Sequence, residues 1–490
     1  MWRPSFECRF PPDRYGRSLF RLPEYVLSCP IHARFVAWGP RGTRTVSNVS
    51  QDQAAGTSTE DYPSETYAWY VVAVLVFAYT VSYVDRTILT LMVKPIRETL
   101  GISDVQISLL HGLAFAIFYT VLGVPLGWLA DRGNRTKIIA GGIFVWSMMT
   151  ALCGLARSFS QMFLARVGVG VGEAALSPAA YSMINDYFRP QRRTLAISIY
   201  ATGVYIGSGL ALIVGGSVIA ITPSLELLVV GHLEPWQVVF LAVGLPGLLV
   251  AALMLTVKEP KRRGLMKGGQ PTIKETLAFM RARFAIYGFH FLGFSMLTML
   301  WSGCAAWIPT FFARTFEWTP AQMGPIFGTI VAIFGTIGLI SGGAFAEKLK
   351  HSGKTDGNIR VGVISAVVLL PLGVLAPLMP SAELAMTVYA AFVFFSSLPF
   401  GAAAAALQEI TPNQMRGQVS ALYLFVVNLT GIGIGPTIVA SITQYGFGDD
   451  LALKYSLSIT AGIAAVLAAV LLTLCLKPYR ESVAMARDWI

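Results

Sequence analysis

Apolar runs of about 20 residues are the feature that most restricts what this chain of 490 residues can fold into. A helix of about 20 residues is needed to cross a hydrocarbon core about 30 Å thick. Lipid offers no partner for unpaired backbone groups, and these runs are too long and continuous for barrel strands. The sequence therefore predicts an all-α polytopic membrane protein.

Twelve runs meet this length requirement, and the low content of charged residues, 13% against about 25% in soluble domains, agrees with them. We expect membrane-spanning helices over residues 69–92, 106–130, 138–156, 162–184, 196–221, 238–257, 285–312, 323–345, 361–378, 384–407, 419–445 and 453–476.

Lys and Arg are concentrated in the loops after the even-numbered helices and in the C-terminal tail. The loops after the odd-numbered helices contain only Lys94, Arg97, Arg157, Arg314 and Lys454. Because basic loops stay in the cytoplasm, both termini are predicted to be cytoplasmic, with the chain in the inner (plasma) membrane. The net charge of +11 has the same origin and predicts no nucleic-acid partner.

The remaining segments divide the chain into two six-helix bundles, residues 67–257 and 285–476, with tails at both ends. Residues 1–66 have no sustained apolar run and predict a disordered tail or a start codon assigned too far upstream; a lipid-surface anchor is the alternative. Residues 258–284 form a basic linker, in which Thr272–Glu275 is a capping box that predicts a short amphipathic helix at the membrane surface. Residues 477–490 are the C-terminal tail.

The two bundles show an internal repeat. The run from Gly127 to Asp131 ends the second helix, and the run from Gly343 to Glu347 ends the eighth, 216 positions later. Pro190 and Pro412 precede the fifth and eleventh helices at a similar offset of 222. This near-constant period indicates duplication of a six-helix unit, so the halves are expected to be pseudo-symmetric.

The segment GWLADRGNRTK, residues 127–137, resembles the signature loop between helices 2 and 3 of the major facilitator superfamily. Twelve helices in two related halves with a basic middle loop also resemble that superfamily. Within it, the segments 83–86 (YVDR), 166–174 (RVGVGVGEA) and 411–417 (TPNQMRG) are similar to the spinster-like branch in its bacterial form.

The resemblance implies a cytoplasmic gate built from this loop. The acid in the place of Asp131 lies against a helix N-terminus of the other half, and the base in the place of Arg135 reaches an acid at the end of helix 4, here Asp186. The gate motif in this chain is Gly127, Asp131, Arg132, Arg135, Lys137 and Asp186. The alternative is that these charges only follow the positive-inside rule. The second copy, at Glu347, lacks the basic spacing, and no equivalent latch is predicted there.

Four charged residues lie well inside the predicted spans: Asp85 and Arg86 in the first helix, and Arg166 and Glu173 in the fourth. Such groups are costly in a bilayer and mark function. Burial favours the neutral form of a carboxyl group, whereas Arg stays charged. We therefore expect Glu173, nearer the midplane, and then Asp85 to take up a proton, and Arg86 and Arg166 to bind an anionic group. The alternative is a permanently neutral structural quartet.

The corresponding helices of the second half contain no acidic or basic charge but are rich in Met and aromatic residues. Trp301 and Met299 in the seventh helix, and Phe394 and Phe395 in the tenth, are candidates for a wall that takes an apolar tail; helix packing is the alternative. A site with one polar and one apolar wall suits an amphipathic ligand. The spinster-like resemblance likewise implies lysophospholipids or phosphorylated sphingoid bases.

These observations predict a monomeric secondary transporter that works by alternating access, coupled to protons and moving an amphipathic, lipid-like substrate. One alternative is a carrier, uncoupled or proton-coupled, of a small organic anion or other metabolite. Another is a membrane sensor or scaffold that transports nothing. Five scattered cysteines and the lack of hydrolase motifs predict no metal, no cofactor and no enzymatic activity.

Overall fold

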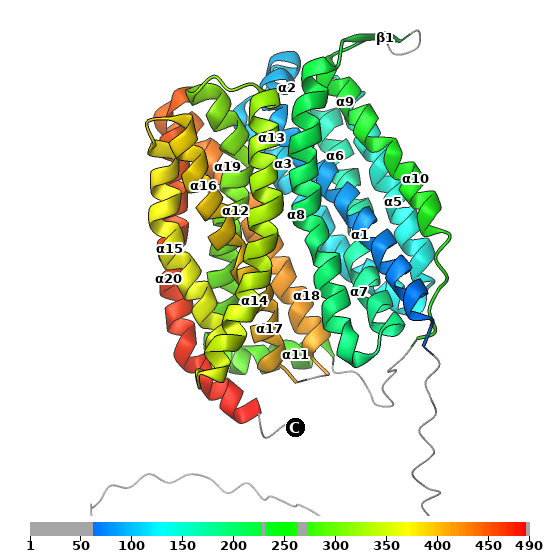
Figure 1. The fold of residues 1–490 in the computed structure, drawn as a ribbon, viewed down its shortest axis with the longest axis vertical. Coiled ribbons are helices and arrows are strands. Elements are labelled where there is room, and N and C mark those ends of the chain that lie inside the picture. The colour runs from blue at the N-terminus through cyan, green and yellow to red at the C-terminus, as the bar shows by residue number, and fades with distance from the viewer. Residues whose placement is uncertain (1–61, 228–230, 263–271, 413, 487–490) are drawn as a thin grey trace, which may run out of the picture. The chain divides into compact units, whose positions relative to one another are not determined.

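The computed structural model describes residues 62–227, 231–262, 272–412 and 414–486, and in them it is almost entirely helical (Figure 1). The predicted tail of residues 1–66 therefore lies outside the described residues except for its last five. Residues 263–271 of the predicted linker also lie outside them. The prediction of an all-helical bundle is confirmed.

The first half consists of six helices, several of them broken, which run from blue to green in Figure 1. They are α1 (Glu65–Thr87), α3 (Asp104–His111) with α4 (Leu113–Arg132), α5 (Arg135–Cys153), α6 (Phe159–Glu173) with α7 (Leu176–Tyr187), α8 (Pro190–Ile221), and α9 (Pro235–Gly244) with α10 (Pro246–Met254).

The second half repeats this arrangement. Its helices are α12 (Phe284–Thr315), α13 (Pro320–Ile330) with α14 (Thr336–His351), α15 (Gly357–Leu375), α16 (Ala382–Ser397) with α17 (Pro399–Glu409), α18 (Arg416–Val427) with α19 (Gly435–Ser441), and α20 (Leu453–Ala486). Short 3₁₀ or π-helical turns, η2 to η7, extend or join these helices at Ile88–Leu91, Val331–Gly335, Ala376–Leu378, Asn428–Ile434, Ile442–Phe447 and Asp450–Ala452.

Eleven helices of the described chain are long and apolar enough to cross a membrane. The remaining predicted span is the pair α6 and α7, which is interrupted after Glu173 and contains Arg166 as well. The break leaves two short helices, of 15 residues in α6 and 12 in α7. With that broken helix counted, the described residues contain the predicted set of spans.

Three elements were not predicted from the sequence. The amphipathic helix α2 (Val93–Leu100) follows α1, and a two-stranded antiparallel hairpin, β1 (Leu225–Leu227) with β2 (Gly231–Leu233), follows α8. Both lie at one end of the bundle, which we call the hairpin end (Figure 1). The third is the last part of α20, which continues to Ala486 instead of ending at residue 476, because Tyr479 and Ser482 are buried against the bundle.

The linker contains the helix α11 (Ile273–Ala282), which begins with the reciprocal bonds between Thr272 and Glu275 that a capping box predicts. It lies at the opposite end of the bundle, which we call the terminal end (Figure 1). Its place at a membrane surface stays a prediction. The orientation of these two ends in a membrane stays a prediction.

The two halves approach each other closely where their helices carry glycine. A Cβ atom at Gly209 or Gly216 in α8 would lie within 3 Å of the α13 or η3 backbone or its Cβ atoms, and one at Gly112 would lie 2.4 Å from the carbonyl oxygen of Gly433. Small residues allow such backbone contact between membrane helices. These contacts place the packing between the halves toward the hairpin end.

Candidate functional site

Arg86 and Glu173 form a buried ion pair between α1 and α6. The Nε and Nη2 groups of Arg86 both donate to Oε2 of Glu173, with the Nε distance at 2.6 Å. Ser82, one helical turn before Arg86, donates from its hydroxyl to the same oxygen at 2.5 Å. The Arg86 side chain is 15% exposed and that of Glu173 is fully buried. One oxygen of the carboxylate thus receives three contacts.

The other carboxylate oxygen of Glu173, Oε1, is buried and has no hydrogen-bond partner. A buried acceptor without a partner is costly when it carries negative charge. All the side-chain contacts of this carboxylate with Arg86 and Ser82 are therefore made by Oε2, and the predicted uptake of a proton by Glu173 stays a prediction.

Asp85 and Arg166 form a second, separate arrangement beside the first. Oδ2 of Asp85 accepts from the hydroxyl of Thr150 at 3.2 Å, and its Oδ1 is buried without a partner. Arg166 donates from Nη1 to the backbone carbonyl of Asp85 at 3.2 Å and from Nε to that of Leu110 at 3.4 Å. Arg166 is 1% exposed.

The structure thus brings the four predicted charges together, but in two different roles. Arg86 and Glu173 neutralise each other directly, whereas the guanidinium of Arg166 is bound by carbonyls next to the breaks that follow α1 and α3. Carbonyl groups at helix ends lack intrahelical partners, and a buried cation satisfies them. Of the two arginines, Arg86 is the more accessible to a ligand.

Arg135 organises a second polar site at the terminal end of the first half. It donates to Oδ2 of Asp186 at 2.5 Å, to Oε1 of Glu259 at 2.6 Å and to the carbonyl of Pro260 at 3.0 Å. The contact with Asp186 is the one that the family resemblance implied. The contact with Glu259 was not predicted from the sequence, although an acid directly after the last helix of a basic half is a visible signal.

The other members of the gate motif are placed as follows. Gly127 faces α7, where an added Cβ would lie 3.8 Å from Pro178. Lys137 and Arg132 are exposed, and Asn134 caps the backbone N–H of Lys137 at 2.9 Å. The side chain of Asp131 lies outside the part of the chain that the structure describes, so its predicted contact with the other half stays a prediction.

The second half contains a counterpart of the Arg135 site in altered form. Glu409, at the end of α17, is at the position related to Asp186 by the internal repeat; it pairs with Lys350 and accepts a hydrogen bond from Tyr479 at 2.5 Å. No latch is predicted here from the sequence, because Lys350 lies before the loop between α14 and α15 and not after it. Glu409 thus pairs with a base at a position that does not correspond to that of Arg135.

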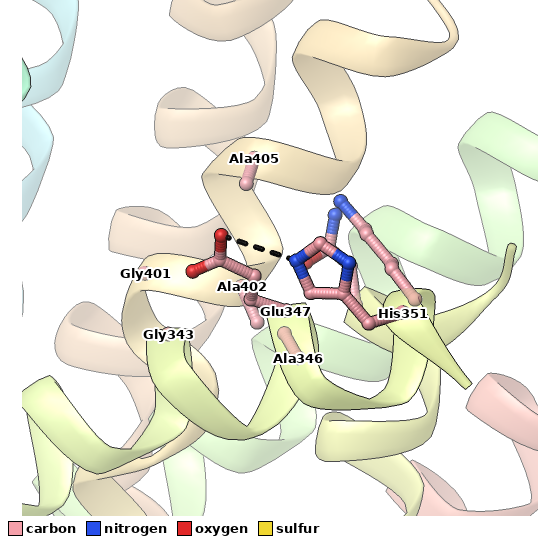
Figure 2. Close-up of a pocket in the computed structure, with 9 residues that line it drawn as sticks. Gly343, Ala346, Glu347, His351, Gly401, Ala402 and Ala405 are labelled. Carbon is pink, nitrogen blue, oxygen red and sulfur yellow. Dashed lines mark ion pairs between the residues drawn. The ribbon is translucent and has the colours of Figure 1, made fainter. Parts of the chain in front are cut away.

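Glu347, the counterpart of Asp131, lines a pocket of about 430 Å³ between α14, α15 and α17 (Figure 2). Its carboxylate faces His351 at 3.6 Å, and both side chains are largely exposed. Exposed pairs of this kind contribute little to stability. Glu347 therefore has no fixed buried partner comparable to that of Glu409.

A network of four charges joins the halves at the hairpin end. Arg314 of α12 donates both Nη groups to Asp104 of α3, at 2.7 and 2.8 Å, and Arg97 of α2 contacts Asp104 at 2.9 Å and Asp450 at 2.7 Å. Asp104 is buried, with 2% of its side chain exposed. We call this network of Arg97, Asp104, Arg314 and Asp450 the outer clasp.

The predicted tail wall lies within the second half. Trp301 stacks on Phe392 at 6.4 Å, and Phe394 meets Phe395 edge-to-face at 5.2 Å. Met299 is 8% exposed and packs against Gly431 and Gly435 of the eleventh helix. These contacts are helix packing; only the half-buried residues Trp301, Phe394 and Phe395 leave surface for a ligand.

The Arg135 site yields a stability prediction. Arg135→Ala removes a 1%-exposed guanidinium and leaves Asp186 and Glu259 without their partner, so the free energy of unfolding is expected to fall by about 3 kcal/mol. Thermal unfolding in detergent measures this. Lys137→Ala, two positions away and exposed, is the control and should change stability by less than about 0.5 kcal/mol. Equal effects of the two variants would contradict the assignment.

A bundle of two repeated halves with broken helices and a buried ion pair in the membrane-spanning region has the architecture of a secondary transporter. The chain belongs to the Major Facilitator Superfamily, whose sequence model matches residues 75–436.

Comparisons with individual proteins agree. The chain is 27% identical to an MFS-type efflux pump of Mycolicibacterium smegmatis over 89% of its own length and 99% of that protein. It is 26% identical to a probable L-galactonate transporter of Escherichia coli, over 57% and 61% of the two chains. It is also similar to the crystal structure of a bacterial homolog of the human lysosomal transporter Spinster in an inward-facing, unoccupied conformation, with a TM-score of 0.70, 26% identity, and coverage of 87% and 99%. The chain is thus a spinster-like transporter of this superfamily.

Proposed function

We propose that this transporter couples the movement of protons to that of an amphipathic substrate with an anionic head group. The observation that carries the proposal is the pair of Arg86 and Glu173, in which a cation that is partly exposed is neutralised by a buried acid. When Glu173 takes up a proton at Oε1, the pair changes from neutral to a net charge of +1. An anionic head group then replaces the lost negative charge beside Arg86.

In this proposal Asp85 is a second proton site, because its Oδ1 is likewise buried without a partner. Arg166, held by two backbone carbonyls, keeps the region positive and fixes the breaks in the first and second helices. Proton and substrate then cross together. A zwitterionic or cationic head group would compete with the proton and give exchange instead.

The apolar part of the substrate is assigned to the second half, where Trp301, Phe394 and Phe395 are half-buried. Lysophospholipids with an anionic head, such as lysophosphatidylglycerol, and phosphorylated sphingoid bases have the required phosphate and single tail. The likeness to a spinster homolog supports this class. The likeness to a probable L-galactonate transporter supports a second candidate, a small polar organic anion without a tail.

The proposed orientation places the terminal end in the cytoplasm of a cell with the protein in its plasma membrane, since the basic loops lie at that end. The outer clasp then closes the external side, and the chain is in an inward-facing state like that of its structural neighbour. The motif residues Gly127, Asp131, Arg132, Arg135, Lys137 and Asp186 close the cytoplasmic side in the opposite state.

The clasp yields a prediction about conformation. Asp104→Asn replaces the carboxylate that both Arg97 and Arg314 contact, so the inward-facing state is expected to lose stability and a wider separation at the hairpin end to become populated. Pulsed electron spin resonance between labels at residues 94 and 454, in a cysteine-free background, measures this. The matched control is Glu98→Gln, an exposed acid on α2. Distance distributions identical to those of the parent protein would exclude a gating role for the clasp.

Uptake into proteoliposomes tests the function itself. Radiolabelled lysophosphatidylcholine, lysophosphatidylglycerol and galactonate are compared with and without an imposed pH gradient. The proposal expects gradient-driven uptake of lysophosphatidylglycerol, whose head group is anionic, in preference to zwitterionic lysophosphatidylcholine, and no uptake of galactonate. Uptake of galactonate alone would support the second candidate, and no flux of any substrate under any gradient would favour a sensor or scaffold.

A further inference from the structure

Arg86 has a second set of partners besides Glu173. Its guanidinium carbon lies 4.1 Å from the ring centroid of Phe115, 4.7 Å from that of Tyr83 and 5.0 Å from that of Tyr119. All three distances are within the range of about 6 Å over which a cation is attracted to the face of an aromatic ring. We call Tyr83, Phe115 and Tyr119 the aromatic cage.

The cage is built by two helices of the first half. Tyr83 lies one turn before Arg86 on α1, while Phe115 and Tyr119 are four residues apart on α4, hence on one face, and stack at 5.1 Å. Phe115 is 2% exposed. In the region of Arg166, by contrast, the cation contacts are with carbonyl oxygens. The two arginines therefore meet different chemistry.

We propose that the aromatic cage positions Arg86 and stabilises its charge when Glu173 is protonated, and that it thereby sets the acidity at which the transporter is loaded. This inference rests on the proposed proton coupling. A buried cation that loses its carboxylate partner is strongly disfavoured. Three ring faces offset part of that cost without neutralising the charge, so Arg86 stays in place and remains attractive to an anion.

The other titratable groups that face Arg86 and Glu173 are Asp85 from α1 and the hydroxyls of Tyr83 and Tyr119, and Arg166 from α6 faces Asp85. His111, at the end of α3, faces Arg166. The test therefore leaves all these groups except the cage unchanged.

Infrared difference spectroscopy of the purified full-length protein provides the test and needs no substrate. The carboxylic acid band of Glu173 is identified by its absence in Glu173→Gln, and its growth is followed during acidification. Phe115→Leu and Tyr119→Leu remove one ring each. Each is expected to require about tenfold more acid, a shift of about one pH unit, to develop the band.

Two control variants distinguish the loss of a ring beside Arg86 from other changes in side-chain size or polarity. Tyr119→Phe keeps the ring and loses only the hydroxyl, and Phe118→Leu removes a neighbouring ring of α4 that is 38% exposed. Both are expected to titrate like the parent protein. Thermal unfolding identifies any variant that is misfolded. If Phe115→Leu is misfolded, the comparison of Tyr119→Leu with Tyr119→Phe decides the result.

The outcomes distinguish this inference from the proposed function. A band that titrates at the parental pH, or at higher pH, in both ring-removing variants would overturn the cage. If the band develops at lower pH in the ring-removing variants but the protein transports no lysophospholipid, the role of the aromatic cage is supported and the proposed substrate class is rejected. If Glu173 shows no titrating band while the protein stays folded, both the proton site and the cage are overturned.

Discussion

Arg86→Lys is expected to lower the transport rate of an anionic lysophospholipid by at least about 100-fold, although it preserves the positive charge. Arg86 uses two guanidinium nitrogens on one oxygen of Glu173 and presents its flat face to three rings. Lysine has a single ammonium group and cannot form that fork or stack in the same way. Loss of one charged hydrogen-bond arrangement of this kind costs about 3 kcal/mol, which corresponds to that factor.

Initial rates of tracer uptake, corrected for the amount of reconstituted protein, measure the effect of Arg86→Lys. Arg192→Lys is the matched control, since Arg192 forms an exposed pair with Glu65 at the terminal end of the bundle. A rate within a few-fold of the parent protein would mean that any cation suffices. Arg86 would then contribute charge alone, and the specific geometry of the pair would be irrelevant.

Glu173→Gln is expected to abolish gradient-driven accumulation while substrate exchange at equal pH continues. Gln has nearly the same shape and retains an oxygen that accepts from Ser82 and Arg86, but it cannot take up and release a proton. Coupling is therefore lost with little effect on the fold. Asp85→Asn, at the second buried acid, is expected to reduce accumulation only in part.

Parallel assays of accumulation and of exchange distinguish a loss of proton coupling from a loss of transport. Glu383→Gln, an exposed acid at the start of α16, controls for the loss of one carboxylate. Persistence of full accumulation in Glu173→Gln would remove Glu173 from the coupling role. Loss of both accumulation and exchange would indicate that the residue is needed for substrate binding or for the conformational change itself.

The membrane spans and the four intramembrane charges could be predicted from the sequence because their signals are local. A run of about 20 apolar residues has one stable solution in lipid, and a charge within it stands out. The breaks after Thr87, at Gly112 and after Glu173 were not predicted. They depend on packing against other helices, such as the contact of Gly112 with the Gly433 carbonyl.

The partners of the charges were harder to predict than the charges. Arg135 with Asp186 was reached through family resemblance, whereas its contact with Glu259 joins residues 124 positions apart without a spacing rule. The outer clasp is a more extreme case, since Arg97 meets Asp450 across 353 positions. The available signal was that Arg97 and Arg314 are among the few basic residues in loops where such residues are scarce.

The division of roles between Arg86 and Arg166 also required the structure. Both arginines lie inside predicted spans, and sequence reasoning assigned both to an anionic ligand. Their surroundings differ because Arg86 faces Glu173 and aromatic rings, while Arg166 points at backbone carbonyls exposed by helix breaks. A residue type fixes what a side chain can bind, but its neighbours decide which of those partners it meets.

In the proposed mechanism, binding of an anionic head group at Arg86 is linked to protonation of Glu173. The decisive measurement is proton uptake by the purified protein in unbuffered detergent solution, with lysophosphatidylglycerol added to the parent protein and to Glu173→Gln. We expect uptake of about one proton per bound lipid by the parent protein and none by the variant, with lipid binding to both. Binding by the parent protein without proton uptake, or equal uptake by both proteins, would contradict it.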